Sequence, residues 1–463
     1  MSVPSGRMSA SAWSWSLYQG ARDPYIILIG TYVFIPYFAT AVVGDAVKGQ
    51  SFVAAYSLIS SLLVAVTAPV LGAAVDRMGA RKPWLLALTA LSVPLIAALW
   101  FATPAGVVGM GVIPTLAVLT AISVLLSYGD VFYNAMLMSA ANADEQPSAS
   151  GWALSLGNAV SIVMLLAVLF AFAMPGLPGM DWLPAAPLFG LDRDTHQPDR
   201  VVGPIVAVVF GLLAAPLFLF SRDGARTGVP FGRALREGAG HLAGLFKGAR
   251  APRDVVLYLV ARMLYIDGKM ALLVFGGVYA AGVMGWGGLE LLVLGIVATL
   301  SGVIGGVMGG WLDRAVGPRE AFKIEIAVTV LALIVQLGTT PARVAYLWPV
   351  EAGVAPLWNA PMFGSAPEVV YLACAVVISL FGTASWASSR TLMARLTPPE
   401  EAGAFFGLFA LSQTATMWVG PLLIDLFTRT FKSQPAGFIP IVVMMLAGLV
   451  LLFPVKGGGK VAA

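Results

Sequence analysis

The sequence predicts an all-α membrane protein of twelve transmembrane helices in two pseudo-symmetric six-helix halves. Three observations predict this class: an apolar composition, twelve separate apolar segments and a loop pattern that occurs once in each half. Of the 463 residues, 59% are hydrophobic and 11% are charged, whereas about 25% are charged in an average soluble protein. A water-soluble chain of this size could not bury so much apolar surface. A soluble enzyme and a single-span receptor are therefore excluded.

Twelve apolar segments are each long enough for a transmembrane helix, which needs about 20 apolar residues. They are 24–44, 51–75, 83–103, 108–138, 150–174, 202–220, 254–282, 287–312, 322–341, 367–388, 403–427 and 436–454. The N-terminal residues have no apolar run of the signal-peptide kind, so the segment from Pro24 is expected to be a retained span. We expect a six-helix half over 1–220, a basic cytoplasmic linker over 221–253 and a second half over 254–463.

The distribution of positive charge predicts the orientation of these segments. With the N-terminus inside, 19 of the 27 Lys and Arg residues lie on the cytoplasmic side and six lie outside. Because cytoplasmic loops carry an excess of Lys and Arg, both termini are expected in the cytoplasm. The linker carries seven of these charges and is expected to be mainly a topology determinant and tether.

A pattern of glycine, aspartate and arginine follows the second segment and returns after the eighth. It reads G-x-x-x-D-R and then G-x-R, with one extra residue before the second glycine of the later copy. Glycine permits close helix contact, aspartate can cap a neighbouring helix, and the basic residues can pair with acids. Such a repeat is typical of the related halves of a secondary transporter, where it could latch a cytoplasmic gate. The residues are Gly72, Asp76, Arg77, Gly79, Arg81 and Lys82 in the first copy and Gly309, Asp313, Arg314, Gly317 and Arg319 in the second.

This loop pattern resembles the signature of the major facilitator superfamily, and the resemblance covers the whole chain. Further stretches resemble the branch that includes the autophagy-related vacuolar amino-acid effluxer and its bacterial relatives; they are 14–18, 131–137, 261–268, 389–398, 405–408 and 420–423. The resemblance implies alternating access and export of a small organic solute, with amino acids as first choice. The sequence departs from that branch at 19–24, where substrate would be touched.

The seventh segment carries three ionisable residues, Arg262, Asp267 and Lys269. Each charge costs about 2.5–3.5 kcal/mol on insertion scales, so each is a functional candidate. At about 100° per residue, Arg262 and Lys269 fall roughly 20° apart with Tyr265 close by, and Asp267 lies roughly 140° from Arg262. We expect one of the cations to meet a substrate carboxylate and Asp267 to be its partner or a proton carrier. The alternative is that the three charges neutralise one another across helices.

Other candidates lie on the first, fourth and tenth segments. Arg22 and Asp23 lie at the interface if the first helix begins at Pro24, and in the cavity if it begins near Trp13. Asp130, with Tyr133 and Asn134, is a candidate protonation site. Trp386 and Arg390 on the tenth segment are candidates for closing the cavity, with Arg390 equally a positive-inside anchor, and Asp425 and Glu325 are expected to be structural groups near segment ends.

We therefore expect a secondary transporter that moves a small organic solute across a bacterial inner membrane, with proton coupling through Asp23, Asp130 or Asp267. The sequence contains no phosphate-binding loop, no H-E-x-x-H and no G-x-S-x-G pattern, which argues against an enzyme. One Cys and two separated His residues predict no metal ion, and no cofactor or nucleic-acid partner is expected. The expected partners are the solute, the lipid bilayer and protons, and the expected state is a monomer.

Two alternatives remain open at this point. Residues 79–84 also resemble the corresponding loop of melibiose-permease-type carriers, which favours a glycoside/cation symporter. A transport-dead facilitator fold acting as a receptor or assembly factor is the other alternative. The repeated gate pattern argues against it, because a static scaffold needs no pair of latches.

Overall fold

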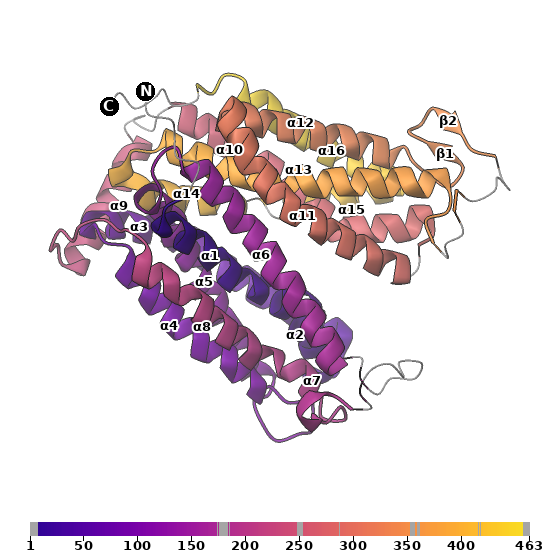
Figure 1. Cartoon of the computed structure of the whole chain (residues 1–463), viewed down its shortest axis with the longest axis horizontal. Coiled ribbons are helices and arrows are strands. Elements are labelled where there is room, and N and C mark those ends of the chain that lie inside the picture. Colours follow the sequence, from indigo (N-terminus) through magenta and orange to yellow (C-terminus); the bar gives the residue numbers. More distant parts are fainter. Residues whose placement is uncertain are drawn as a thin grey trace. The chain divides into compact units, whose positions relative to one another are not determined.

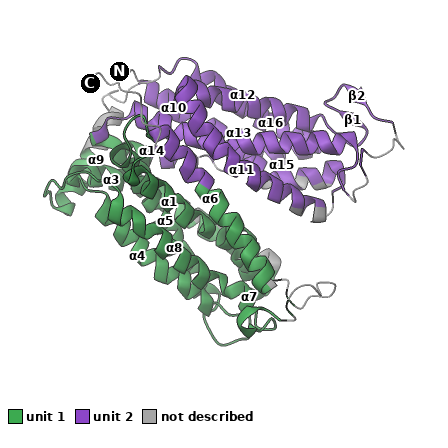
Figure 2. Ribbon diagram, in the orientation of Figure 1, with its two compact units in different colours: residues 1–145, 156–240, 400–407 green, residues 146–155, 241–399, 408–463 purple. Residues whose placement is uncertain are grey.

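The structure is a computed structural model that describes residues 8–173, 175, 184, 186–247, 253–286, 288–351, 357–358, 362–414, 416 and 418–456. The chain forms two compact units (Figure 2). Unit 1 comprises residues 1–145, 156–240 and 400–407, and unit 2 comprises residues 146–155, 241–399 and 408–463. Residues 146–155 come from the N-terminal half of the sequence but belong to unit 2, and residues 400–407 come from the C-terminal half but belong to unit 1.

Unit 1 is a helical bundle in which α1 packs on α8, α3 and α4 pack on α5, and α4 packs on α8. Its helices are α1 (Ala10–Pro24), α2 (Phe34–Tyr37), α3 (Ala46–Met78), α4 (Lys82–Ala98), α5 (Val112–Ala140), most of α6 (Gln146–Val168), α7 (Gln197–Arg200), α8 (Val202–Phe220), the first part of α9 (Phe231–Lys247) and the first turns of α14 (Ala402–Thr414). π-Helical segments continue α1, α2 and α6; they are Tyr25–Tyr32, Phe38–Val42 and Leu169–Ala173.

Unit 2 is a second bundle, in which α13 packs on α11 and α12, and α16 packs on α10, α12 and α15 (Figure 1). Its helices are α10 (Arg253–Tyr279), α11 (Gly288–Val316), α12 (Pro318–Leu337), α13 (Ala366–Leu396), the rest of α14, α15 (Val419–Phe431) and α16 (Gln434–Leu452). A two-stranded antiparallel ribbon, β1 (Arg343–Val344) and β2 (Trp348–Pro349), pairs Arg343 with Pro349.

Nine helical runs in the described part of the chain are long and apolar enough to cross a membrane. The three remaining expected segments coincide with α10, with α12 and with the α14–α15 pair. Ionisable side chains lower the hydropathy of α10 and α12, and the third segment is divided between two shorter helices.

The first span begins at Ala10, which is before the predicted apolar segment 24–44 and close to the alternative start near Trp13. Ser9 caps α1, because its hydroxyl accepts a hydrogen bond from the backbone N–H of Ala12 at 3.2 Å. Pro24 therefore ends α1 instead of opening a helix. As a consequence, Arg22 lies about 18 Å along the helix from its first residue.

The second glycine of each repeated motif breaks one helix from the next. Gly79, between α3 and α4, has a φ of +82°, and Gly317, between α11 and α12, has a φ of +85°. Glycine adopts this left-handed conformation without the steric penalty of a side chain. The sequence repeat is therefore also a repeat of backbone geometry.

Glycines on α11 allow two neighbours to approach its backbone in unit 2. A side chain at Gly305 would overlap the carbonyl oxygen of Leu380 on α13, and one at Gly310 would meet the carbonyl oxygen of Pro147 on α6 at 2.6 Å. Glycines spaced in this way place helix backbones in contact.

Candidate functional site

Unit 1 contains a buried ion cluster on α1 and α5. The Arg22 guanidinium donates to the Asp23 carboxylate at 2.8 Å and also forms an ion pair with Asp130. The side-chain amide of Gln19, one helical turn before Asp23, donates to both Asp23 oxygens. Because α1 starts at Ala10, Arg22 is only 8% exposed. The Arg22–Asp23 pair therefore lies deep in the span and not at its end.

Two carboxylates share one guanidinium in this cluster, and they differ in access. The Asp23 side chain is 16% exposed, whereas that of Asp130 is 36% exposed. The space beside Asp23 depends on Gly157 of α6, because a side chain there would overlap the Asp23 carboxylate. The cluster therefore has one acid more than it has bases, and Asp130 is the more accessible of the two acids.

Tyr133 and Asn134 follow Asp130 on α5, and Tyr133 belongs to an aromatic stack. Its ring stacks on Trp15 with centroids 4.4 Å apart and on Tyr18 at 5.1 Å. The indole N–H of Trp15 donates to the Tyr133 carbonyl at 2.8 Å. Tyr133 is 1% exposed, so its ring anchors α1 on α5.

Arg262 and Lys269 point from one face of α10 toward α13, as their separation of seven residues predicted. Arg262 donates to the Ser389 hydroxyl, the Phe409 carbonyl, the Ser412 hydroxyl and the Gln413 side chain. Its guanidinium carbon lies 3.5 Å from the centroid of the Phe409 ring. These bonds use four of the five guanidinium N–H donors. Arg262 is therefore held firmly by neutral groups.

Lys269 is held more loosely than Arg262. Its ammonium donates to the Gly382 carbonyl and lies 4.5 Å from the centroid of the Trp386 ring. An ammonium has three donors, so two remain after the bond to Gly382. Neither Lys269 nor Arg262 forms an ion pair with a carboxylate of the described residues. Unit 2 thus carries two cations on one helix face that have no direct ion pair among the described residues, although Lys269 lies within electrostatic range of the Glu325 carboxylate.

Tyr265 and Asp267 occupy different sides of α10. Tyr265 is fully buried; its hydroxyl bonds to that of Ser385 at 2.5 Å, and its ring meets Phe322 edge-on at 5.6 Å. Asp267 is 1% exposed and lies beside Gly420 in the first turn of α15. The three charges of α10 therefore do not neutralise one another directly.

Asp76 of the first motif copy joins the end of α3 to the start of α14 within unit 1. Its carboxylate accepts hydrogen bonds of 2.8 Å from the backbone N–H groups of both Gly403 and Ala404. Arg81 donates to the same carboxylate at 2.7 Å. Gly72 is required at this contact because a side chain would overlap the carbonyl oxygen of Gly403. The carboxylate is therefore paired by a cation and a helix N-terminus together.

The rest of the first motif copy holds the linker. The Asp223 carboxylate accepts from the backbone N–H groups of Arg81 and Lys82 at 3.0 and 2.8 Å, and so caps α4. The Thr227 hydroxyl donates to the carbonyl of Arg77 at 2.6 Å. The Lys82 ammonium donates a hydrogen bond to the carbonyl of Ser221.

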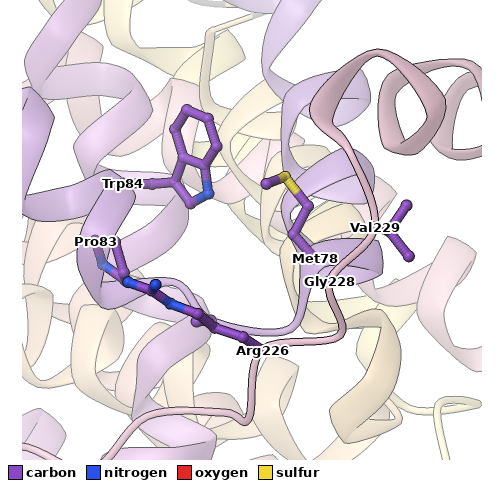
Figure 3. A pocket seen from close by; sticks show the side chains of 7 residues that line it. Met78, Pro83, Trp84, Arg226, Gly228 and Val229 are labelled. Carbon is purple, nitrogen blue, oxygen red and sulfur yellow. The ribbon is translucent and has the colours of Figure 1, made fainter.

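A pocket of about 310 Å³ opens between this motif loop and the linker. Figure 3 shows Trp84 and Met78 on its wall and Arg226 reaching toward Pro83. The Trp84 ring lies 5.2 Å from that of Phe231 at the start of α9. Trp84 thus packs against the linker at the end of a helix.

The second motif copy makes different contacts. Asp313 is 2% exposed and lies against the hydroxyls of Ser388 and Thr391 on α13. Arg319, at the place of Arg81, donates instead to the carbonyl of Phe453 at 2.6 Å and pairs with Glu320. Arg314 is exposed, like Arg77 in the first copy.

Two residues lie beside Asp313. Glu325, expected as a structural group near a segment end, lies in the first half of α12, is fully buried and accepts a hydrogen bond of 2.9 Å from Ser388. Ser388 itself carried no sequence signal beyond its place in an apolar segment. A glutamate inside the apolar segment 322–341 was the signal available for Glu325.

Comparison with known proteins identifies the family of this chain. Residues 37–458 match the family described as "Vacuole effluxer Atg22 like". Autophagy-related protein 22 of Yarrowia lipolytica is 25% identical over 225 residues, which are 47% of this chain and 34% of that protein. The uncharacterized MFS-type transporter YxiO of Bacillus subtilis is 22% identical over 459 residues, 95% of this chain and 93% of that one.

A solved structure shares the fold. The chain is similar to the major facilitator superfamily transporter FucP in its outward conformation, with a TM-score of 0.68, 13% identity and coverage of 96% of this chain and 97% of that one. The matched part spans about a third of the Yarrowia protein's length but nearly all of YxiO and FucP.

Proposed function

Because the chain belongs to the vacuole effluxer Atg22-like family of major facilitator transporters, we propose that it exports amino acids by alternating access. Membership in this family makes it a multi-pass membrane transporter and not an enzyme. The export direction follows the effluxer named in the family description.

The incompletely bonded cation Lys269 is the observation that carries the substrate class. An amino acid presents a carboxylate, and a buried or half-buried cation that forms no direct ion pair attracts it. Arg262 has one N–H donor left, whereas Lys269 has two and is only partly buried. We therefore assign carboxylate binding to Lys269, with Trp386 beneath it and Arg262 adding to the positive potential.

Proton coupling is proposed through the acids that the sequence singled out, Asp23, Asp130 and Asp267. The excess carboxylate of the Arg22 cluster supports Asp130, since a proton would balance its charge. Asparagine at each of the three positions tests the assignment. If none of the three variants changes transport driven by a pH gradient, coupling does not use them.

The proposed setting is the inner membrane of a bacterium, with both termini in the cytoplasm and the chain acting as a monomer. The charge asymmetry of the loops supports this orientation. The motif-loop residues that also resemble melibiose-permease carriers pack against the linker, with Trp84 at the start of α4. The glycoside/cation symporter therefore stays the second candidate, on the loop resemblance alone.

Transport by the purified chain in liposomes tests the proposal. The panel contains labelled amino acids and sugars, each measured with and without an imposed pH gradient. We expect amino-acid flux that responds to the gradient. Sugar flux without amino-acid flux would replace the substrate class, and the absence of flux for every solute would contradict a transporter of amino acids.

A further inference from the structure

Glu325 is a fully buried acid that forms no ion pair with a cation of the described residues. One carboxylate oxygen accepts the Ser388 hydroxyl hydrogen at 2.9 Å. The other, Oε2, has no hydrogen-bond donor among the described residues. Because an unpaired buried charge is strongly disfavoured, this environment requires that the negative charge be removed or balanced.

Asp313 is a second buried acid at the same hydroxyl. Both of its carboxylate oxygens lie without a donor in the described part of the chain. Ser388 and Thr391 approach it from α13, but Ser388 donates to Glu325 and Thr391 donates to the Ala387 carbonyl at 3.1 Å. A hydroxyl has only one hydrogen to give. Two carboxylates thus compete for a single Ser388 hydrogen.

One added proton resolves this shortage. A protonated carboxyl group carries an O–H donor of its own. If Glu325 takes up the proton, it can donate to the Ser388 oxygen, and Ser388 can turn its hydrogen to Asp313. Both acids are then joined through Ser388 with one negative charge between them, and the same holds with the roles of the two acids exchanged.

No charged group on the surrounding helices forms an ion pair with Glu325 or Asp313 among the described residues. The buried Arg390 of α13 acts on Arg262, and Lys323 of α12 pairs with Glu320. From α10, Lys269 acts on Glu325 at a distance but donates its hydrogen bond to Gly382, and Tyr265 bonds to Ser385. From α13, Arg395 acts on Asp313 but is exposed at the helix end. On α11, Arg314 is exposed, and α16 carries no ionisable side chain.

In the first motif copy, the corresponding buried acid, Asp76, is neutralised by an arginine and not by a proton. Asp76 receives Arg81 and two backbone N–H groups. In the second copy, the extra residue before Gly317 displaces the following arginine by one position, and Arg319 turns to Phe453. Asp313 is therefore left without the arginine that its counterpart holds.

We propose that Asp313, Ser388 and Glu325 form a proton-binding site in unit 2, in which one proton is shared between the two acids through the serine hydroxyl. The site makes the second gate motif sensitive to protons where the first motif is held by a permanent ion pair. That this proton takes part in coupled transport rests on the proposed function; its binding does not.

Infrared spectroscopy of the purified full-length chain in liposomes tests proton binding without any substrate. At neutral pH the chain should show the carbonyl-stretch band of a protonated carboxyl group. We expect Glu325→Gln and Asp313→Asn each to lose one component of that band relative to the wild type, because either change leaves a single acid that Ser388 can satisfy. Components from other protonated acids, such as Asp130 or Asp267, should stay the same in both variants. Glu320→Gln is the matched control on the same helix, since Glu320 is half exposed and pairs with Lys323 at 2.9 Å. It should leave the band unchanged.

A band whose intensity in both the Glu325→Gln and the Asp313→Asn proteins equals that of the wild type would overturn the proposal. If those proteins do not fold, Ser388→Ala provides a second measurement. Removal of the bridging hydroxyl should shift the frequency of the band, and an unshifted band would overturn the proposal. Loss of that component of the band in the variants together with gradient-independent transport by the wild type would retain the proton site and reject coupling.

Discussion

Arg81 donates a hydrogen bond of 2.7 Å to the Asp76 carboxylate, and both side chains are almost completely buried. Arg319 occupies the matching place in the second motif but binds the Phe453 carbonyl. The same sequence pattern thus yields an ion pair in one unit and an unpaired acid in the other. This asymmetry makes the two arginines matched probes of the gate motif.

Arg81→Gln should lower the free energy of unfolding by about 3–5 kcal/mol, because it leaves the buried Asp76 charge without its cation. Arg319→Gln should cost about 1 kcal/mol or less, since its ion pair with Glu320 is partly exposed. Denaturant titration of both variants in mixed micelles measures the difference. Equal losses would contradict the assignment of Arg81 to a buried pair.

Gly305→Ala should destabilise unit 2 by about 1–3 kcal/mol, because the new methyl group would overlap the Leu380 carbonyl of α13. Gly295→Ala on the same helix meets nothing within 4 Å and should be neutral or stabilising by up to about 1 kcal/mol. Thermal unfolding in detergent compares the two. A loss at Gly295 as large as that at Gly305 would show that helix packing is not the cause.

Arg22→Gln should destabilise unit 1 by roughly 3 kcal/mol, because Asp23 and Asp130 would keep their charges without a cation. Adding Asp130→Asn to this variant should recover part of the loss, since one of the two charges is removed. A double-mutant cycle on the free energy of unfolding measures this coupling. Strictly additive effects would mean that the Arg22–Asp130 pair contributes nothing.

Lys269→Gln should raise the KM for amino acids about tenfold or more, because a charge-assisted bond to the carboxylate is worth about 1.5–3 kcal/mol. Lys323→Gln serves as the control, since the Lys323 ammonium is already paired with Glu320. Initial rates in liposomes give both values. An unchanged KM in Lys269→Gln would remove this residue from the substrate site.

Glu145 should make the stability of unit 1 depend on pH in the acid range. Partial burial acts against the shift, but hydrogen bonds from the Ser9 and Asn142 backbone N–H groups and the Ser9 hydroxyl hold the pKa of Glu145 below its ordinary value. Because the pKa of Glu145 is lower in the folded state than in the unfolded state, its carboxylate stabilises the fold at pH values above the unfolded-state pKa of about 4.3. This contribution is lost as the pH falls through the folded-state value.

Glu145→Gln should therefore be less stable than the wild type at neutral pH, and the gap should close under acid. Unfolding measured across this pH range checks the expectation. A gap that stays constant from neutral to acid pH would indicate that the carboxylate charge plays no part.

Much of the fold could be predicted from local sequence. Helical apolar segments follow from composition and length, because a backbone in lipid must satisfy its own hydrogen bonds. The relation of Arg262 to Lys269 followed from helix periodicity, and both contact α13. The apolar segment predicted for the first span began too late, at residue 24, whereas the open alternative of a helix that begins near Trp13 agrees with the Ser9 cap and the start of α1 at Ala10.

The sequence by itself determined the helical membrane class, the repeated motif and the ionisable residues placed inside apolar segments. Each of these is a property of neighbouring residues along the chain. Only the tertiary structure decided which groups these charges contact. Arg22 contacts Asp130, Asp76 contacts Arg81 and the backbone N–H of Ala404, and Glu325 contacts the hydroxyl of Ser388. Pairing inside a membrane depends on which helix faces touch, and contacts between distant segments are set by packing that no local pattern contains.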